Sequence, residues 1–121
     1  MNAKILVVDD SQMVRCSVGR TLVGAGFNVV EAIDGADALN KLAANDDTRL
    51  VVCDVNMPRM SGIEFLEALR STAAANVAVV MLTTEGQPEL IQRAKALGAK
   101  GWIVKPFKPE LLVAAAKKLT A

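Results

Sequence analysis

Short apolar runs in this sequence end repeatedly in acidic, hydroxyl or basic residues. The residues in question are Asp9, Asp10, Asp54, Thr83, Thr84 and Lys105. If the runs are parallel strands of one sheet, their carboxyl ends meet at the same edge, which is where open α/β sheets bind ligands. The sequence therefore predicts that these side chains lie together in one site.

The acidic part of this predicted site has the composition of a divalent cation site. Asp9, Asp10 and Asp54 would repel one another when crowded, unless a cation balanced their charge. A hard ion with oxygen ligands meets this need, and Mg²⁺ keeps open positions for water and for phosphate oxygens. It can also neutralise charge on a phosphoryl group during transfer. We therefore expect Mg²⁺ as the cofactor.

The remaining polar residues are suited to binding phosphate. Lys105 can pair with a carboxylate in an empty site and with a phosphoryl oxygen in a filled one, and Thr83 can donate a hydrogen bond to another oxygen. Asp54 lies between the acidic and the cationic parts of this set. Because a carboxylate can attack an activated phosphorus and form an acyl phosphate, Asp54 is the predicted nucleophile.

The composition indicates a globular protein of a reducing compartment. Its 121 residues are 52% hydrophobic, which suffices for the core of a single domain over residues 1–121. A net charge of +1 gives no electrostatic reason to expect nucleic acid or a membrane surface as a direct partner. Cys16 and Cys53, with no histidine, suggest neither a disulfide framework nor a zinc site. Without a signal peptide or membrane span at the N-terminus, a soluble cytoplasmic protein is expected.

Apolar runs alternate with amphipathic stretches along the chain. The predicted strands cover residues 4–8, 28–32, 50–53, 77–82 and 101–104. Three of them are almost continuously apolar, as expected of parallel strands that are covered on both faces. Helices are therefore predicted on both sides of the sheet.

Helix signals lie between the predicted strands. Ser11 can cap a helix that stops at Gly24 or Gly26, and Ser61 with Glu64 forms a capping-box pattern. Pro88 and Pro109 open two later helices, and residues 36–44 carry a weaker pattern. Five strands and five helices in strict alternation predict a doubly wound α/β fold with right-handed crossovers.

Four motifs together resemble those of the receiver domains of bacterial response regulators. The motifs are Asp9-Asp10, Asp54-Val55-Asn56-Met57-Pro58, Thr83-Thr84-Glu85 and Lys105-Pro106-Phe107. The resemblance covers the whole chain and is greatest to stand-alone chemotaxis receivers of the CheY type. It implies a flavodoxin-like fold whose five parallel strands follow the order 2-1-3-4-5.

The resemblance implies a role for each acidic residue. Asp54 is implied as the acceptor of a phosphoryl group from a phosphohistidine. Mg²⁺ is implied to bind the carboxylates of Asp10 and Asp54 and the backbone carbonyl of Asn56, with Asp9 acting through a metal-bound water. Asn56 and Glu85 are implied to tune dephosphorylation, and a short-lived phosphoryl group is expected.

The remaining implied roles concern the response to phosphorylation. Thr83 and Lys105 are implied to contact the phosphoryl group, and the Lys105–Pro106 peptide is implied to be cis. Trp102 occupies the position of the family's switch aromatic, where Tyr or Phe is more common. Movement of Thr83 and rotation of this aromatic side chain are implied to remodel the face that binds partners.

The implied function is a phosphorylation-dependent switch of a two-component system, in chemotaxis signalling. The switch would catalyse its own phosphorylation from a phosphodonor and its own dephosphorylation without otherwise being an enzyme. Implied partners are a CheA-like histidine kinase, a target such as a flagellar motor switch, and a phosphatase; a monomer is expected. A role as phosphate relay or sink stays open.

Other interpretations account for parts of the pattern. A Mg²⁺-dependent aspartyl phosphatase or phosphotransferase would need a second acid two residues after the nucleophile, where this chain has Asn56. A flavin-binding electron carrier would need aromatic loop residues. Taken singly, the aspartate pair can be a helix cap, Lys105-Pro106 a strand end and Trp102 a core residue. Their joint spacing favours the receiver interpretation.

Overall fold

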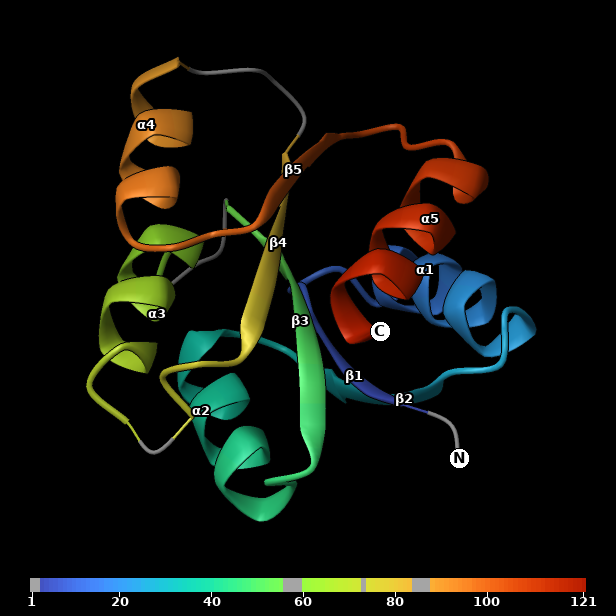
Figure 1. Ribbon diagram of the computed structural model, residues 1–121, viewed down its shortest axis with the longest axis horizontal. Helices are drawn as coiled ribbons and strands as arrows, with labels where there is room; N and C mark the ends of the chain where they lie inside the picture. The colour runs from blue at the N-terminus through green and yellow to red at the C-terminus, as the bar shows by residue number, and fades with distance from the viewer. Residues whose placement is uncertain (1–2, 56–59, 73, 84–87) are drawn as a thin grey trace.

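The computed structural model describes residues 3–55, 60–72, 74–83 and 88–121, which form a parallel sheet between two layers of helices (Figure 1). The strands are β1 (Lys4–Val8), β2 (Asn28–Ala32), β3 (Thr48–Asp54), β4 (Ala78–Thr83) and β5 (Gly101–Val104). The helices are α1 (Gln12–Gly24), α2 (Gly35–Ala44), α3 (Gly62–Leu69), α4 (Pro88–Ala96) and α5 (Pro109–Thr120). This strict alternation confirms the predicted α/β class.

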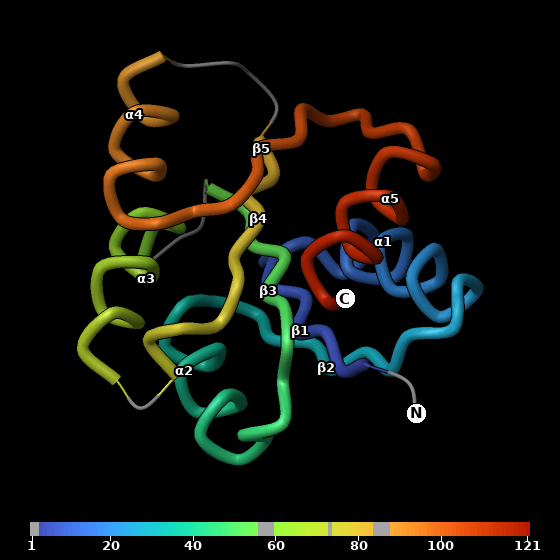
Figure 2. Tube along the Cα trace, viewed as in Figure 1, coloured from blue at the N-terminus to red at the C-terminus, as the bar shows by residue number. Residues whose placement is uncertain are grey.

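The five strands lie in the order β2-β1-β3-β4-β5, and every neighbouring pair is parallel. This is the predicted order 2-1-3-4-5. In register, Val8 pairs with Ala32 on one side and Cys53 on the other, and Asp54 pairs with Leu82. The carboxyl ends of the strands therefore meet at one edge of the sheet, and those of β3, β4 and β5 lie in the upper part of the view in Figure 2.

Helices α2, α3 and α4 cover one face of the sheet, and α1 and α5 lie side by side on the other (Figure 1). Successive strand residues point to opposite faces, so β1 contributes Leu6 and Val8 to one core cluster and Ile5 and Val7 to the other. All four side chains are almost completely buried. The nearly continuous apolar character of this strand follows from cover on both faces, as predicted.

Helix ends follow the predicted capping chemistry. The Ser11 hydroxyl accepts a hydrogen bond from Val14 N at 3.3 Å, and α1 ends at Gly24. The Ser61 and Glu64 side chains form a complete capping box at the start of α3. Pro88 and Pro109 are the first residues of α4 and α5, as the sequence predicted.

Two strands differ in extent from the prediction. β3 begins at Thr48 rather than at residue 50, because Thr48 pairs with Lys4 of β1 and its polar side chain does not prevent this pairing. β4 covers Ala78–Thr83 rather than 77–82. Val77 N is bonded to Ala74 O in the preceding turn, whereas Thr83 still pairs with Val104 of β5. Pairing partners, rather than apolar character alone, set these ends.

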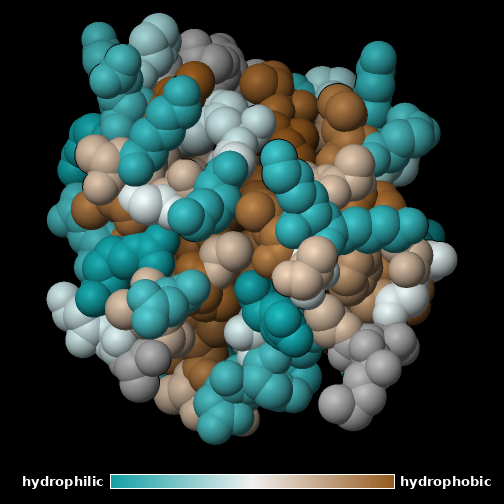
Figure 3. Space-filling model, viewed as in Figure 1, coloured by the Kyte–Doolittle hydropathy of each residue, from teal (hydrophilic) through white to brown (hydrophobic). Residues whose placement is uncertain are grey.

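The surface is mixed in character. On the face shown in Figure 3, hydrophobic residues are visible near the middle and near the upper edge, and hydrophilic side chains lie between them. Among the residues whose placement is described, the exposed large hydrophobic ones are Met13, Val23, Ile33, Val104 and Leu111. Among the helices of the described residues, none has the length and apolar character needed to cross a membrane.

Candidate functional site

Three carboxylates gather where β1 and β3 end. Asp9 and Asp10 directly follow β1, and Asp54 is the last residue of β3. One carboxylate oxygen from each of the three lies within 4.8 Å of the others. Asp9 is 1% exposed and Asp54 5% exposed, whereas Asp10 is exposed to solvent. The predicted convergence of the acidic residues is therefore confirmed, with one carboxylate of the three facing water.

Lys105 brings the positive charge of this site. Its Nζ lies 3.2 Å from Asp9 Oδ2 and 3.4 Å from Asp54 Oδ1, and its side chain is 15% exposed. The residue follows β5, its backbone N–H donates to the carbonyl of Thr83, and the Lys105–Pro106 peptide is cis, as expected. Because the ammonium lies between two nearly buried carboxylates, it offsets part of their mutual repulsion.

Every polar group of Asp9 has a partner. Its N–H donates to Ala32 O at 3.2 Å, and its backbone carbonyl accepts from Arg15 Nη1 at 2.7 Å. Its carboxylate accepts from Ser11 N at 2.9 Å and from Lys105 Nζ at 3.2 Å. Asp9 is thus a fixed inner carboxylate, beside which Asp10 presents its side chain to solvent.

The backbone around Asp54 is closely packed. Val55 N donates to Leu82 O at 2.9 Å, which continues the pairing of β3 with β4 just beyond the carboxylate. Gly62 approaches Asp54 from the start of α3, and a Cβ atom at this position would lie less than 3.0 Å from the backbone oxygen of Asp54. Only glycine, which has no Cβ atom, allows α3 to approach the backbone of Asp54 this closely.

Cys53 lies beside Asp54 inside the sheet. Its thiol is fully buried and donates to the backbone oxygen of Asp54 at 3.3 Å. Burial, followed by the charges of Asp54 and Asp9, raises the pKa of the Cys53 thiol well above its ordinary value. The thiol therefore stays protonated and packs as a small apolar group.

Thr83 and Trp102 lie on the neighbouring strands β4 and β5. Thr83 is the last residue of β4 and is 2% exposed. Trp102 in β5 pairs with Met81 and packs against the core cluster on the face covered by α2, α3 and α4. Within the described part of the chain, its indole Nε1 is buried without a hydrogen-bond partner.

Three predicted site residues, Asn56, Thr84 and Glu85, lie outside the described residues. The donors that are described fit a hard divalent cation, because they offer only carboxylate oxygens and one of them, Asp10, opens to solvent. Both carboxylate oxygens of Asp9 already accept hydrogen bonds from the protein. Its arrangement is consistent with an indirect role at a cation site.

Sequence reasoning missed three residues that shape the site. Arg15 contacts the carbonyl of Asp9, Glu31 contacts Arg15 at 3.1 Å, and Gly62 packs on Asp54. A glycine directly after the capping residue Ser61 was a usable signal, because glycine is a poor helix former. Arg15 and Glu31 gave no such signal, since they look like ordinary charged residues of an exposed helix face and an edge strand.

Comparison with known proteins is consistent with this geometry. A family model described as "Response regulator receiver domain" matches residues 5–117. Chemotaxis protein CheY1 of Helicobacter pylori is 42% identical over 112 residues, which cover 90% of either chain. A chemotaxis protein CheY homolog of Campylobacter jejuni is 39% identical over 112 residues, covering 90% of this chain and 85% of the relative.

A solved structure extends the likeness to the fold. The structure of Vibrio cholerae chemotaxis protein CheY4 superimposes with a TM-score of 0.92 at 43% sequence identity, covering 98% of this chain and 99% of the other. The family model covers almost the whole sequence, and the two relatives and the solved structure each share more than a third of the aligned residues. The chain therefore belongs to the response regulator receiver domains, the CheY-like signalling modules of two-component systems.

Proposed function

We propose that the protein is a Mg²⁺-dependent phosphorylation switch whose phosphoacceptor is Asp54. The contact of Lys105 Nζ with Oδ1 of Asp54, at 3.4 Å, is the single observation that carries this proposal. This contact places a positive charge against a nearly buried carboxylate at the edge of the sheet where open α/β folds bind ligands. An incoming phosphoryl group would bring new oxygens within reach of that ammonium.

Asp10 and Asp54, with the backbone carbonyl of Asn56, would hold Mg²⁺, and Asp9 would contribute through a water molecule. When bound, Mg²⁺ supplies charge neutralisation for the phosphoryl oxygens. The contacts of Asp9 support this division, because Ser11 N and Lys105 Nζ already occupy its carboxylate oxygens. Asp10 is the exposed member of the cluster and is the natural direct ligand.

In the transfer step, a carboxylate oxygen of Asp54 attacks the phosphorus of a phosphohistidine. The new O–P bond forms as the N–P bond of the donor breaks, and the histidine nitrogen keeps the electron pair of the broken bond. Lys105 then pairs with a phosphoryl oxygen, and the Thr83 hydroxyl donates a hydrogen bond to another. Water, under the influence of Asn56 and Glu85, then attacks the phosphorus; the O–P bond to Asp54 breaks, inorganic phosphate leaves and the Asp54 carboxylate is restored.

Trp102 is the proposed reporter of the phosphorylated state. Among the described residues, the buried indole N–H of Trp102 has no hydrogen-bond partner. A buried polar group that stays unpaired costs about 1–3 kcal/mol, so polar contacts with the described residues do not favour its present orientation. A rotation that gives this N–H a partner would recover part of that cost. The chain has one tryptophan, and its fluorescence should change when Mg²⁺ and a phosphodonor are added together and not with either alone.

The names of the relatives favour chemotaxis as the pathway, since those proteins are called chemotaxis proteins. On this basis a CheA-like histidine kinase in the cytoplasm is the proposed phosphodonor, and a flagellar motor switch the proposed target. A phosphatase that shortens the signal would be a further partner.

Phosphotransfer from such a kinase tests the proposal directly. A CheA-like kinase carrying a radiolabelled phosphohistidine should transfer the label to the wild-type chain within seconds to minutes in the presence of Mg²⁺. Asp54→Asn should accept none, while Asp46→Asn should behave as wild type, because it removes an exposed carboxylate that precedes β3, at the opposite end of the strand from Asp54. Retention of the label on the kinase with both wild-type and Asp46→Asn protein would contradict the proposed donor.

A further inference from the structure

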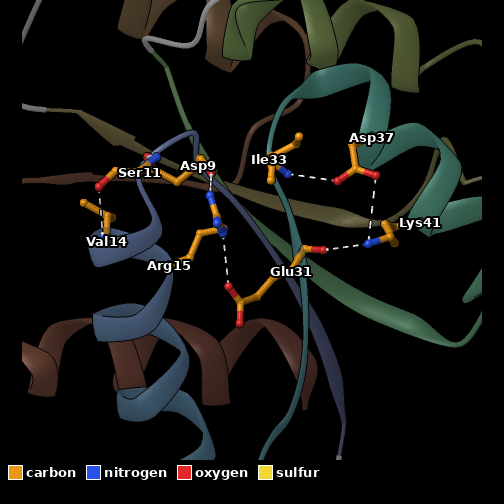
Figure 4. Close-up of polar contacts among 8 residues, drawn as sticks. All are labelled: Asp9, Ser11, Val14, Arg15, Glu31, Ile33, Asp37 and Lys41. Atoms are coloured by element: carbon orange, nitrogen blue, oxygen red, sulfur yellow. Dashed lines mark hydrogen bonds and ion pairs between the residues drawn. The ribbon is translucent and has the colours of Figure 1, made fainter.

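Arg15 of α1 joins two strands next to the acidic cluster. Its Nη1 donates to the backbone carbonyl of Asp9 at 2.7 Å, and its Nε donates to Oε1 of Glu31 in β2 at 3.1 Å. The Arg15 side chain is only 13% exposed, although it starts from a helix surface. Figure 4 shows the Arg15 side chain lying between Asp9 and Glu31.

The acceptor carbonyl belongs to the peptide that links Asp9 to Asp10. The N–H of Asp9 is fixed by Ala32 O, and its carboxylate is fixed by Ser11 N and Lys105 Nζ. Arg15 therefore completes the set by fixing the one remaining polar group of Asp9. Because a peptide unit is planar, holding this carbonyl also sets the direction from which the next residue, Asp10, leaves the backbone.

Glu31 determines where the guanidinium points. The donors of a guanidinium are fixed in one plane. The hydrogen bond from Nε to the Glu31 carboxylate therefore also orients Nη1, which donates to the Asp9 carbonyl. The same carboxylate balances the charge of Arg15. Without it, a long cationic side chain five residues after the exposed Asp10 would be attracted to the acidic cluster and would compete with a bound cation.

We propose that Arg15 is a positioning residue for the cation site and that Glu31 orients it. Arg15 holds the Asp9–Asp10 peptide so that the Asp10 carboxylate is presented to Mg²⁺, and Glu31 keeps the guanidinium on the backbone carbonyl and off the metal ligands. This inference rests on the proposed Mg²⁺ site. It predicts an effect of opposite sign to simple electrostatics, because removing a positive charge beside a cation site should otherwise strengthen cation binding.

Calorimetric titration of the full chain with Mg²⁺ shows whether replacing Arg15 weakens or strengthens Mg²⁺ binding. Arg15→Gln should bind Mg²⁺ about tenfold more weakly than wild type, the lower end of the usual effect of losing a partner that orients metal ligands. Arg20→Gln is the matched control, since it removes the same charge from an exposed position farther along α1. It should bind as wild type does or slightly more tightly. Equal Mg²⁺ affinities for Arg15→Gln and Arg20→Gln would overturn the proposal.

A second variant covers the case in which Arg15→Gln does not fold. Arg15→Lys keeps the charge but lacks the fork, so it should also bind Mg²⁺ more weakly than wild type. Glu31→Gln should weaken Mg²⁺ binding in the wild-type background and have less effect in Arg15→Lys, because its action passes through the guanidinium. An Arg15→Lys protein with wild-type affinity, or full additivity in this cycle, would refute the positioning role.

The same titrations separate this inference from the function on which it rests. If wild type binds Mg²⁺ and Asp10→Asn does not, the cation site stands, and the Arg15 variants alone decide the positioning role. If the wild-type protein binds no Mg²⁺, or if the Asp10→Asn protein binds Mg²⁺ with the same affinity as wild type, the proposed cation site is wrong. The positioning role of Arg15 is then wrong as well.

Discussion

The ammonium of Lys105 lies 3.4 Å from a carboxylate oxygen of Asp54, although 51 positions separate the two residues in the sequence. The pairing of β3 with β4 and of β4 with β5 brings them together at one edge of the sheet. Lys105 also contacts Asp9 at 3.2 Å, so one cation serves two nearly buried carboxylates. The charges of these two carboxylates are therefore offset in part by the same ammonium group.

Loss of this cation should destabilise the protein. Lys105→Met leaves two nearly buried carboxylates facing each other, and breaking a buried ion pair by removing one partner costs about 3 kcal/mol. Urea unfolding should show this decrease, and added Mg²⁺ should recover part of it by binding the folded state. Lys108→Met, an exposed position on the same loop, is the control and should change the unfolding free energy little. Equal unfolding free energies for the two variants would count against the contacts of Lys105.

A methyl group at position 62 should also be costly. Gly62→Ala places a Cβ atom less than 3.0 Å from the backbone of Asp54, and overpacking of this kind costs about 1–3 kcal/mol. Because the backbone of Asp54 must shift, phosphorylation from acetyl phosphate should also slow. Gly24→Ala, at a position with nothing within 4 Å of the added atom, should be neutral or slightly stabilising. Chemical denaturation of the two variants checks the comparison.

Acid titration should reveal the Lys4–Asp47 pair. A hydrogen bond from Lys4, at 2.9 Å, is the main cause that holds the pKa of Asp47 below its ordinary value of 3.8. A carboxyl whose pKa is lower in the folded state adds stability above its unfolded pKa of about 3.9, and this contribution is lost as the pH falls through the folded value. Carboxyl-carbon NMR should find the low pKa in wild type and a value closer to the ordinary one in Lys4→Met. If the Asp47 carboxyl of Lys4→Met titrated at the same pH as in wild type, the result would argue against the Lys4–Asp47 hydrogen bond.

The two cysteines should differ in reactivity. Cys16 is exposed on α1, whereas Cys53 is buried in β3 and its thiol pKa is raised by burial and by neighbouring carboxylates. A disulfide reagent at pH 8 should therefore modify one thiol rapidly in the native protein and the second only after denaturation. In Cys16→Ser the rapid phase should disappear, and a rapid phase that survives would mean that Cys53 is accessible.

Much of this structure follows from local signals in the sequence. Continuous apolar runs identified the strands, and Ser11, Ser61 and the two helix-opening prolines marked helix starts, because these patterns depend on nearby residues alone. The polar residues after the strands also predicted the gathering of Asp9, Asp10, Asp54 and Lys105, since parallel strands bring their carboxyl ends to one edge. The family motifs then supplied the strand order.

The rest depends on contacts between segments that are distant in the sequence. β3 begins at Thr48 because β1 offers it a partner, and nothing local to residue 48 indicates this. The contact of Arg15 with the Asp9 carbonyl likewise requires α1, β1 and β2 to be in place. The environment of the Trp102 indole is set by packing across the sheet. Such features follow from the assembled fold and were not visible in spacing or composition.

Phosphorylation by a small donor tests the central claim most directly. Wild-type protein would be incubated with acetyl phosphate and Mg²⁺, and its intact mass followed over time beside Asp54→Asn and the surface control Asp46→Asn. The account predicts a gain of one phosphoryl group in wild type and Asp46→Asn that requires Mg²⁺, maps to Asp54 and decays after the donor is removed. No gain in wild type, or the same gain in Asp54→Asn, would contradict it.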